Sequence, residues 1–88
     1  MKEILYSETA LKQLNKISKG DKKSAKMILD AIEKYASNPE GKYDVKSLKG
    51  AFGNFKRLRI GNYRVIFDED GNIVSIIEIK HRQEAYHD

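Results

Sequence analysis

The feature that most constrains the fold is the pair Gly61-Asn62, which stands between two runs rich in apolar residues. Such a pair is a strong signal for the two-residue loop of a β-hairpin. If these residues form the loop, Arg59 lies directly opposite Arg64. Side chains alternate along a strand, so one face of the predicted hairpin is apolar. That face carries Leu58, Ile60, Tyr63, Val65 and Phe67.

The other face of this hairpin is predicted to carry arginines. Arg59 and Arg64 are cross-strand neighbours there, with Arg57 and Ile66 beside them, and like charges directly opposite each other destabilise a sheet. A fold keeps such a cluster more easily when an anion binds to it. The alternative is a solvated basic face whose arginines fan apart, with a carboxylate such as Asp68 reducing the repulsion. The pattern alone leaves both interpretations open, and a one-residue change of register would scatter the cluster.

The residues before the hairpin predict a strand followed by two helices. Residues 3–6 form a short apolar run, and Ser7 is a good N-cap for a first helix. Asp21 can cap a second helix, which Asn38-Pro39 ends. Apolar residues recur at helical spacing in both segments. Residues 40–51 lack such periodicity and are predicted to be a loop that leads into the hairpin.

A second hairpin is predicted after the first. Asp70-Gly71 is a strong loop signal, and the β-branched residues 73–79 favour a strand. Pairing across that loop places Phe67 opposite Val74. The expected fold is a single α+β domain over residues 1–88. It comprises an N-terminal strand, a two-helix hairpin and a three-stranded antiparallel meander, in one sheet with the helices packed on one face.

The C-terminal residues are rich in groups that titrate or donate hydrogen bonds. In the register above, Gly61 pairs with Lys80, so the tail leaves the sheet beside the first hairpin loop. Side chains of the tail are therefore expected to approach Arg59 and Arg64. The tail includes His81, Arg82, Glu84, Tyr86 and His87.

Composition narrows the classes of partner and cofactor. The 88 residues include 17 Lys and Arg against 13 Asp and Glu, a net charge of +4 that favours polyanionic partners such as nucleic acid. The absence of cysteine excludes disulfides and suits a reducing cytoplasm. No signal peptide or membrane span is expected. Zinc signatures, glycine-rich phosphate loops and nucleophile elbows are absent, so no cofactor or metal is expected.

The arginine cluster is compatible with cleavage of RNA without a metal. Arginine forks match phosphate oxygens bidentately, and fixed cations stabilise a pentacoordinate phosphate. RNA supplies its own nucleophile, the 2′-hydroxyl, so the protein need only align it and move two protons. His81 titrates in the useful range, whereas Tyr86 does so only if nearby arginines lower its pKa. The alternative for Tyr86 is a packed or capping aromatic residue.

Three segments together resemble the RelE/ParE superfamily of toxins from prokaryotic toxin–antitoxin pairs: Leu48–Gly50, Arg57–Phe67 and Ile79–Tyr86. The resemblance covers nearly the whole chain. The RelE branch consists of ribosome-dependent endoribonucleases that cut mRNA in the decoding site. The resemblance therefore implies metal-independent mRNA cleavage by the 2′-hydroxyl, inhibition of translation, and neutralisation by a RelB-like antitoxin that wraps the toxin.

The resemblance also implies roles for individual residues. Arg64 matches the family's transition-state arginine, and Arg82 matches the arginine that contacts the scissile phosphate or leaving group. Tyr86 matches the terminal tyrosine taken as general base or as a stacking partner. His81 is a second candidate acid or base.

Other cations are expected to bind RNA along the same surface. Arg57 best fits one of the family's strand lysines, while Lys56 is out of phase with them. Arginine is a poor base, so a general base at this position, where the family has a lysine, is less well supported in this chain. The expected RNA-binding set is Lys46, Lys49, Arg57, Arg59 and Lys80.

Two other functions remain open. The ParE branch shares the fold but poisons DNA gyrase and lacks this catalytic set. A non-catalytic basic binding domain would keep the core and lose the activity of the cluster. The presence of Tyr86 after Arg82 favours the RelE branch.

Overall fold

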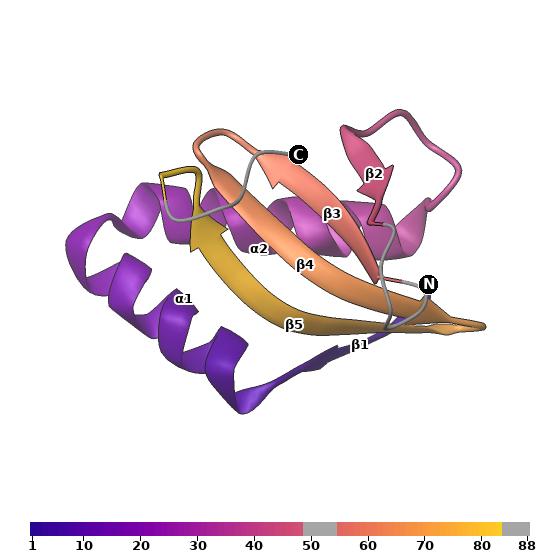
Figure 1. The fold of residues 1–88 in the computed structure, drawn as a ribbon, viewed down its shortest axis with the longest axis horizontal. Coiled ribbons are helices and arrows are strands. Elements are labelled where there is room, and N and C mark those ends of the chain that lie inside the picture. Colours follow the sequence, from indigo (N-terminus) through magenta and orange to yellow (C-terminus); the bar gives the residue numbers. More distant parts are fainter. Residues whose placement is uncertain (49–54, 84–88) are drawn as a thin grey trace.

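The computed structural model describes residues 1–48 and 55–83, and these form two helices and one five-stranded sheet (Figure 1). The α+β fold expected from the sequence is confirmed. In chain order the elements are β1 (Glu3–Tyr6), α1 (Glu8–Gly20), α2 (Lys22–Ser37), β2 (Val45–Ser47), β3 (Phe55–Ile60), β4 (Tyr63–Asp70) and β5 (Ile73–His81).

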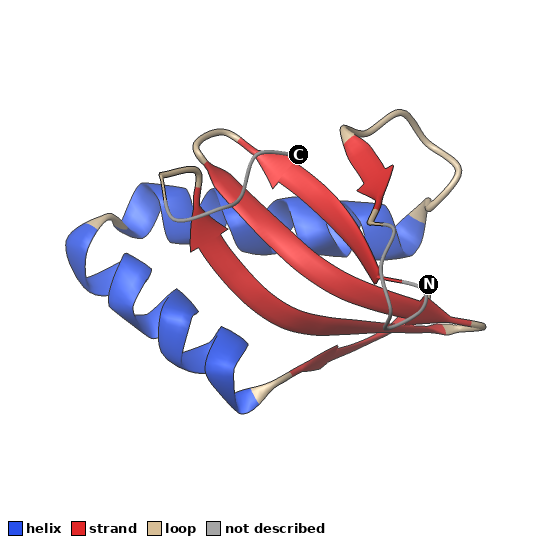
Figure 2. Cartoon of the chain, viewed as in Figure 1, coloured by secondary structure: helices blue, strands red, loops and turns tan. Residues whose placement is uncertain are grey.

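The strands lie in the order β1-β5-β4-β3-β2. The first strand of the chain pairs parallel with the last, and the other neighbours are antiparallel. Both helices cover one face of this sheet, with α2 running behind the strands in the view of Figure 2 and α1 packing on β5. No helix of the described residues covers the opposite face of the sheet.

Both predicted helix caps are present. The Ser7 hydroxyl accepts a hydrogen bond from the Ala10 amide at 3.0 Å and donates one to the Ile77 carbonyl at 2.6 Å. The cap therefore also ties the start of α1 to β5. At the start of α2, the Asp21 carboxylate accepts from the Ser24 amide at 3.1 Å. Each cap satisfies an N–H group that would otherwise lack an intrahelical partner.

The first hairpin has the predicted register. Arg59 pairs with Arg64, and Leu58 pairs with Val65. Gly61, the first residue of the loop, has a φ of +56°. Type II′ hairpin loops require a positive φ at this first position, where glycine is strongly favoured.

The register predicted for the second hairpin is wrong. The loop is Gly71-Asn72 rather than Asp70-Gly71, and Asp70 pairs with Ile73. Gly71 takes the positive φ of +58° as the first loop residue. A loop that began one residue earlier would require a positive φ at Asp70, which costs more without a glycine.

A β-bulge between Ile66 and Phe67 shifts the pairing of β4 and β5 by a further residue. Phe67, on the loop side of the bulge, lies opposite Ile76 rather than Val74 because of the loop register alone. Beyond the bulge, Arg64 lies opposite Lys80, so that two cations become neighbours there. A bulge adds one residue to one strand and cannot be inferred from the alternation of apolar side chains.

The prediction of a loop over residues 40–51 is wrong for its middle part. Val45–Ser47 forms β2 at the edge of the sheet, where Lys46 pairs with Arg57. A strand of three residues is too short to show periodicity in the sequence.

The core lies between the helices and the sheet. Tyr35 of α2 meets Phe67 of β4 edge to face, with ring centroids 5.2 Å apart. The largest fully buried side chains are Phe67, Ile28, Ile32, Ile76, Val65 and Val74.

Neither helix of the described part is long and apolar enough to cross a membrane.

Candidate functional site

Cations from four adjacent strands gather on the face of the sheet that carries no helix. Residues paired across strands project to the same side of a sheet. The pairs Arg59–Arg64 and Arg64–Lys80 therefore form a continuous row over β3, β4 and β5. We call the whole set the basic face: Lys46, Arg57, Arg59, Arg64 and Lys80.

Asp44 moderates the repulsion within the basic face. Its carboxylate lies 3.7 Å from the Arg57 guanidinium and 4.0 Å from that of Arg59. The Arg59 amide also donates to the Asp44 carbonyl at 3.0 Å, which fixes Asp44 beside β3. The sequence suggested Asp68 for this role. The contact of Asp44 was not predicted because it depends on β2, which was expected to be part of a loop.

The members of the basic face differ in exposure. Arg57 is buried, with only 6% of its side chain exposed, whereas Arg59 is 47% exposed. Lys46 is exposed at the sheet edge, and the Lys80 ammonium lies 3.6 Å from the Glu78 carboxylate. Arg57 thus contributes charge from beneath the surface, while Lys46 and Arg59 are accessible to a large ligand.

Arg82 lies where the basic face ends. Its amide donates to the carbonyl of Asn62 at 2.7 Å, and the residue is exposed. The predicted exit of the tail beside the first hairpin loop is therefore confirmed. The pairing that places it there is Tyr63 with His81, not Gly61 with Lys80.

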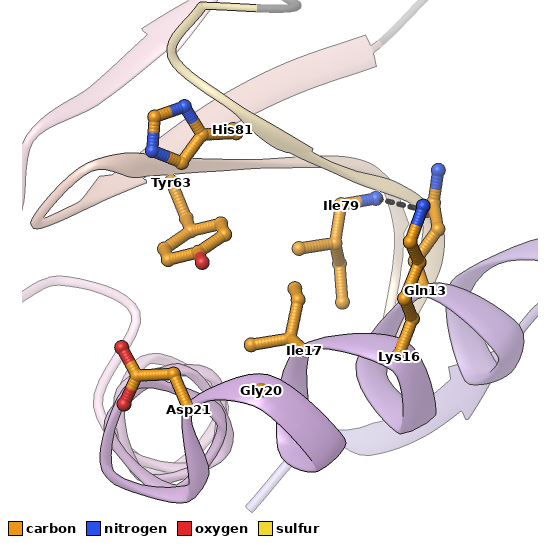
Figure 3. A pocket seen from close by; sticks show the side chains of 8 residues that line it. All are labelled: Gln13, Lys16, Ile17, Gly20, Asp21, Tyr63, Ile79 and His81. Atoms are coloured by element: carbon orange, nitrogen blue, oxygen red, sulfur yellow. Dashed lines mark hydrogen bonds between the residues drawn. The ribbon is translucent and has the colours of Figure 1, made fainter.

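The structure does not bring His81 to the basic face. Its ring meets that of Tyr63 edge to face, with centroids 5.2 Å apart, on the side of the sheet that the helices cover. Figure 3 shows both rings beside a cavity that α1 also lines. The sequence predicts His81 near Arg64, but the two residues lie on opposite faces of the sheet. Two other predicted site residues, Lys49 and Tyr86, lie outside the described residues.

A half-buried carboxylate at the other end of the sheet is a feature that was not predicted from the sequence. Glu69 accepts a hydrogen bond from the Tyr35 hydroxyl at 2.6 Å and pairs with Lys56 at 2.8 Å and Lys2 at 2.6 Å. We call these four residues the Glu69 cluster. The sequence did contain a signal for this cluster. Side chains alternate along a strand, and Lys56 and Glu69 both fall on the apolar side of their strands.

The Glu69 cluster shifts the pKa values of its members. Burial acts to raise the pKa of Glu69, but the hydrogen bonds from Lys2, Lys56 and Tyr35 outweigh it and lower that pKa to about 2. Burial and the bond to Glu69 raise the pKa of Tyr35 well above its usual value. Lys56, out of phase with the basic face, therefore has a structural role here.

Comparison with known proteins gives the family. A family model described as "ParE toxin of type II toxin-antitoxin system, parDE" matches residues 4–86. The chain belongs to this toxin family. The prediction of a RelE/ParE toxin, made from the arginine motif and the element order, is thereby confirmed.

Relatives of this toxin bear the RelE name. Toxin RelE3 of Methanocaldococcus jannaschii is 29% identical over 84 residues, which cover 96% of this chain and 94% of the relative. The putative toxin RelE4 of the same organism is 33% identical over 89 residues, covering 98% and 92%. The crystal structure of a RelB–RelE antitoxin–toxin complex from Methanococcus jannaschii contains a similar chain. That similarity has a TM-score of 0.66 and 26% identity, and it covers 90% of this toxin and 91% of that chain.

Within the described residues, no group of three or more His, Asp or Glu side chains is placed to hold a metal ion. The basic face itself offers the chemistry of fixed cations. Guanidinium and ammonium groups bind phosphate and stabilise negative charge that develops on it.

Proposed function

We propose that this toxin is a ribosome-dependent endoribonuclease that cleaves mRNA and so inhibits translation. The supporting observation is the row Arg59–Arg64–Lys80 across three strands, which ends beside Arg82. Three cations in adjacent positions repel one another in the free protein. The phosphodiester backbone of RNA carries a row of negative charges that complements these cations.

In the proposed reaction the 2′-oxygen of RNA attacks the adjacent phosphorus, and the bond to the 5′-oxygen breaks. A general base takes the 2′-hydroxyl proton, and the leaving 5′-oxygen receives a proton. Arg64 stabilises the charge on the pentacoordinate phosphate, while Arg82 contacts the leaving side. Arg59 and Lys80 hold phosphate oxygens near them.

The general base is proposed to come from the C-terminal tail. His81 faces away from Arg64, which makes Tyr86 the first candidate for this role. Cations near a tyrosine favour its phenolate and so lower its pKa. Arginine itself keeps its proton and cannot serve as the base.

We propose an antitoxin as the protein partner, because a RelE relative has been crystallised as a complex with RelB. An acidic segment that folds on binding would complement the basic face. Such a segment would cover the cations that RNA needs, and neutralisation follows from that competition.

Inhibition of DNA gyrase is the alternative function, and the ParE name of the matching family model favours it. Gyrase poisoning would require binding to a protein surface rather than attack on RNA. The two functions therefore predict different damage in cells: cut mRNA in one case and gyrase-dependent DNA breaks in the other.

Controlled expression in bacterial cells, followed by mapping of mRNA 5′ ends, tests the proposal. New cuts at codon-phased positions are expected, and they should vanish in an Arg64→Ala, Arg82→Ala variant. Lys34→Ala is the matched control, since it removes one exposed cation from the C-terminal end of α2, on the far side of the sheet from the basic face. Growth arrest without cuts, together with DNA breaks, would replace this proposal with gyrase inhibition.

Binding of RNA should weaken steeply with salt. With about three to five phosphate contacts, the affinity for a non-cleavable 2′-O-methyl RNA should fall about 20- to 100-fold between 50 and 200 mM salt. Fluorescence anisotropy measures this dependence. Lys46→Ala should reduce the slope of log affinity against log salt by about 0.7, whereas Lys34→Ala should leave it unchanged. An affinity independent of salt would contradict binding through the basic face.

A further inference from the structure

We propose that the cavity between the helical hairpin and the ends of β4 and β5 binds one unstacked nucleobase of the RNA whose backbone lies on the basic face. This inference rests on the proposed function and adds a second subsite to it. The cavity has a volume of about 440 Å³, which is ample for a single base (Figure 3).

The walls of the cavity suit a flat aromatic ligand. Ile17 of α1 and Ile79 of β5 supply aliphatic surface, and the rings of Tyr63 and His81 stand at 89° to each other. A base stacked on one of these rings presents its edge to the other. Stacking on aromatic side chains is a general means of holding bases of single-stranded nucleic acid.

Polar groups at the rim can meet the edge of a base. Gln13 and Lys16 of α1 line one side, and Asp21 lies at the junction of the helices (Figure 3). Amide and ammonium groups donate hydrogen bonds and a carboxylate accepts them, so both kinds of base-edge group find a partner.

The cavity and the basic face meet at the same end of the sheet. Consecutive residues point to opposite faces, so Tyr63 lines the cavity while Arg64 belongs to the basic face. His81 and Lys80 repeat this arrangement on β5. An RNA strand held by Arg64 therefore needs only to turn around the end of two strands to place a neighbouring base in the cavity.

Charge around the cavity also favours a polyanion. Lys19, Lys22 and Lys23 are exposed at the corner between α1 and α2, in addition to Lys16 at the rim. An acidic protein segment would meet the same lysines. The pair of perpendicular rings is what favours a nucleobase over such a segment, because acidic side chains have no flat apolar surface to stack.

Gly20 offers a way to fill the cavity without disturbing the fold. It lines the cavity, and a Cβ atom added there meets no heavy atom of the described residues within 4 Å. Gly20→Leu should therefore place a side chain in the space that the base would occupy. Gly20→Ala is the matched control, since it makes the same backbone change with almost no added volume.

The test compares two labelled ligands on the full-length protein by fluorescence anisotropy. One is a 2′-O-methyl RNA octamer, which cannot be cleaved, and the other is an octamer of abasic spacer phosphates. The wild type should bind the base-bearing octamer about 10-fold more tightly, as expected for one stacked base. Gly20→Leu should remove this preference and Gly20→Ala should keep it. Arg64→Ala should weaken binding of both ligands by a similar factor.

A second measurement on the wild type does not depend on any variant. Addition of the 2′-O-methyl octamer should shift the methyl NMR signals of Ile17 and Ile79, and the abasic octamer should not. Equal affinity for the two octamers, or shifts with an acidic antitoxin segment alone, would overturn the nucleobase subsite while leaving RNA binding by the basic face intact. Failure of both octamers to bind would instead refute the proposed RNA function itself.

Discussion

Replacing Arg64 with alanine should lower the rate of mRNA cleavage at least about 100-fold and abolish growth arrest, while the protein stays folded. Arg64 occupies the centre of the row on the basic face, with Arg59 on one side and Lys80 on the other. In the proposed reaction its fork stabilises charge that appears only as the phosphate becomes pentacoordinate. Loss of such a contact reduces the rate of the chemical step far more than it weakens binding of the RNA.

Single-turnover cleavage on programmed ribosomes measures this effect directly. Arg64→Lys keeps the charge but loses the bidentate geometry, so its rate should fall between those of the wild type and Arg64→Ala. The control variant Lys34→Ala should cleave at the wild-type rate. An Arg64→Ala protein that is folded and still cleaves normally would show that Arg64 has no part in the chemistry.

Circular dichroism and thermal unfolding separate a catalytic from a structural role. Removal of one cation from between Arg59 and Lys80 relieves like-charge repulsion. We therefore expect Arg64→Ala to retain the secondary structure of the wild type. A variant that fails to fold would identify Arg64 as a structural residue instead.

The sequence predicts the first hairpin well because a single feature determines its register. Gly61 is the natural residue for the positive φ at the start of the loop, so the pairing of Arg59 with Arg64 follows by counting. In the second hairpin the same preference places Gly71 first in the loop, and the Asp-Gly signal is misleading there. The bulge at Ile66 and Phe67 then depends on packing of the whole sheet, which local sequence does not encode.

The candidate site is predictable to the extent that it follows from strand alternation. Arg59 and Arg64 were expected to be neighbours and are. The contact of Asp44 with the arginines was not predictable, because it requires β2, and His81 was misplaced because the bulge determines which face its side chain joins. Alternation describes one strand at a time, whereas a site is assembled from several.

The Glu69 cluster shows that charged residues on the apolar side of a strand can indicate a structural ion pair. A lysine and a glutamate on the apolar side of adjacent strands are costly to bury unless they pair. Glu69 pairs with Lys56 and Lys2 and accepts a hydrogen bond from Tyr35, and only 10% of its side chain is exposed. The cluster thus connects the N-terminus, α2, β3 and β4 at the end of the sheet remote from Arg82.

Glu69→Gln should lower the free energy of unfolding at pH 7 by about 2 to 3 kcal/mol. The folded protein holds the pKa of Glu69 at about 2, below its usual value of 4.5, so the ionised carboxylate stabilises the fold. Glutamine keeps the shape but removes the charge that Lys2 and Lys56 require. Urea denaturation at pH 7 measures the difference, with Glu8→Gln as the control. Glu8 forms an exposed ion pair with Lys12, and its loss should cost less than about 1 kcal/mol.

The pH dependence distinguishes loss of charge from loss of packing. A carboxylate whose pKa is lowered on folding contributes its full stability above its unfolded pKa, and this contribution disappears as the pH falls towards the folded pKa. The gap in unfolding free energy between wild type and Glu69→Gln should therefore be constant above about pH 5 and close between pH 4.5 and pH 2. A gap that stays the same from pH 7 to pH 2 would mean that the glutamine disturbs packing, and that the charge of Glu69 contributes nothing to the fold.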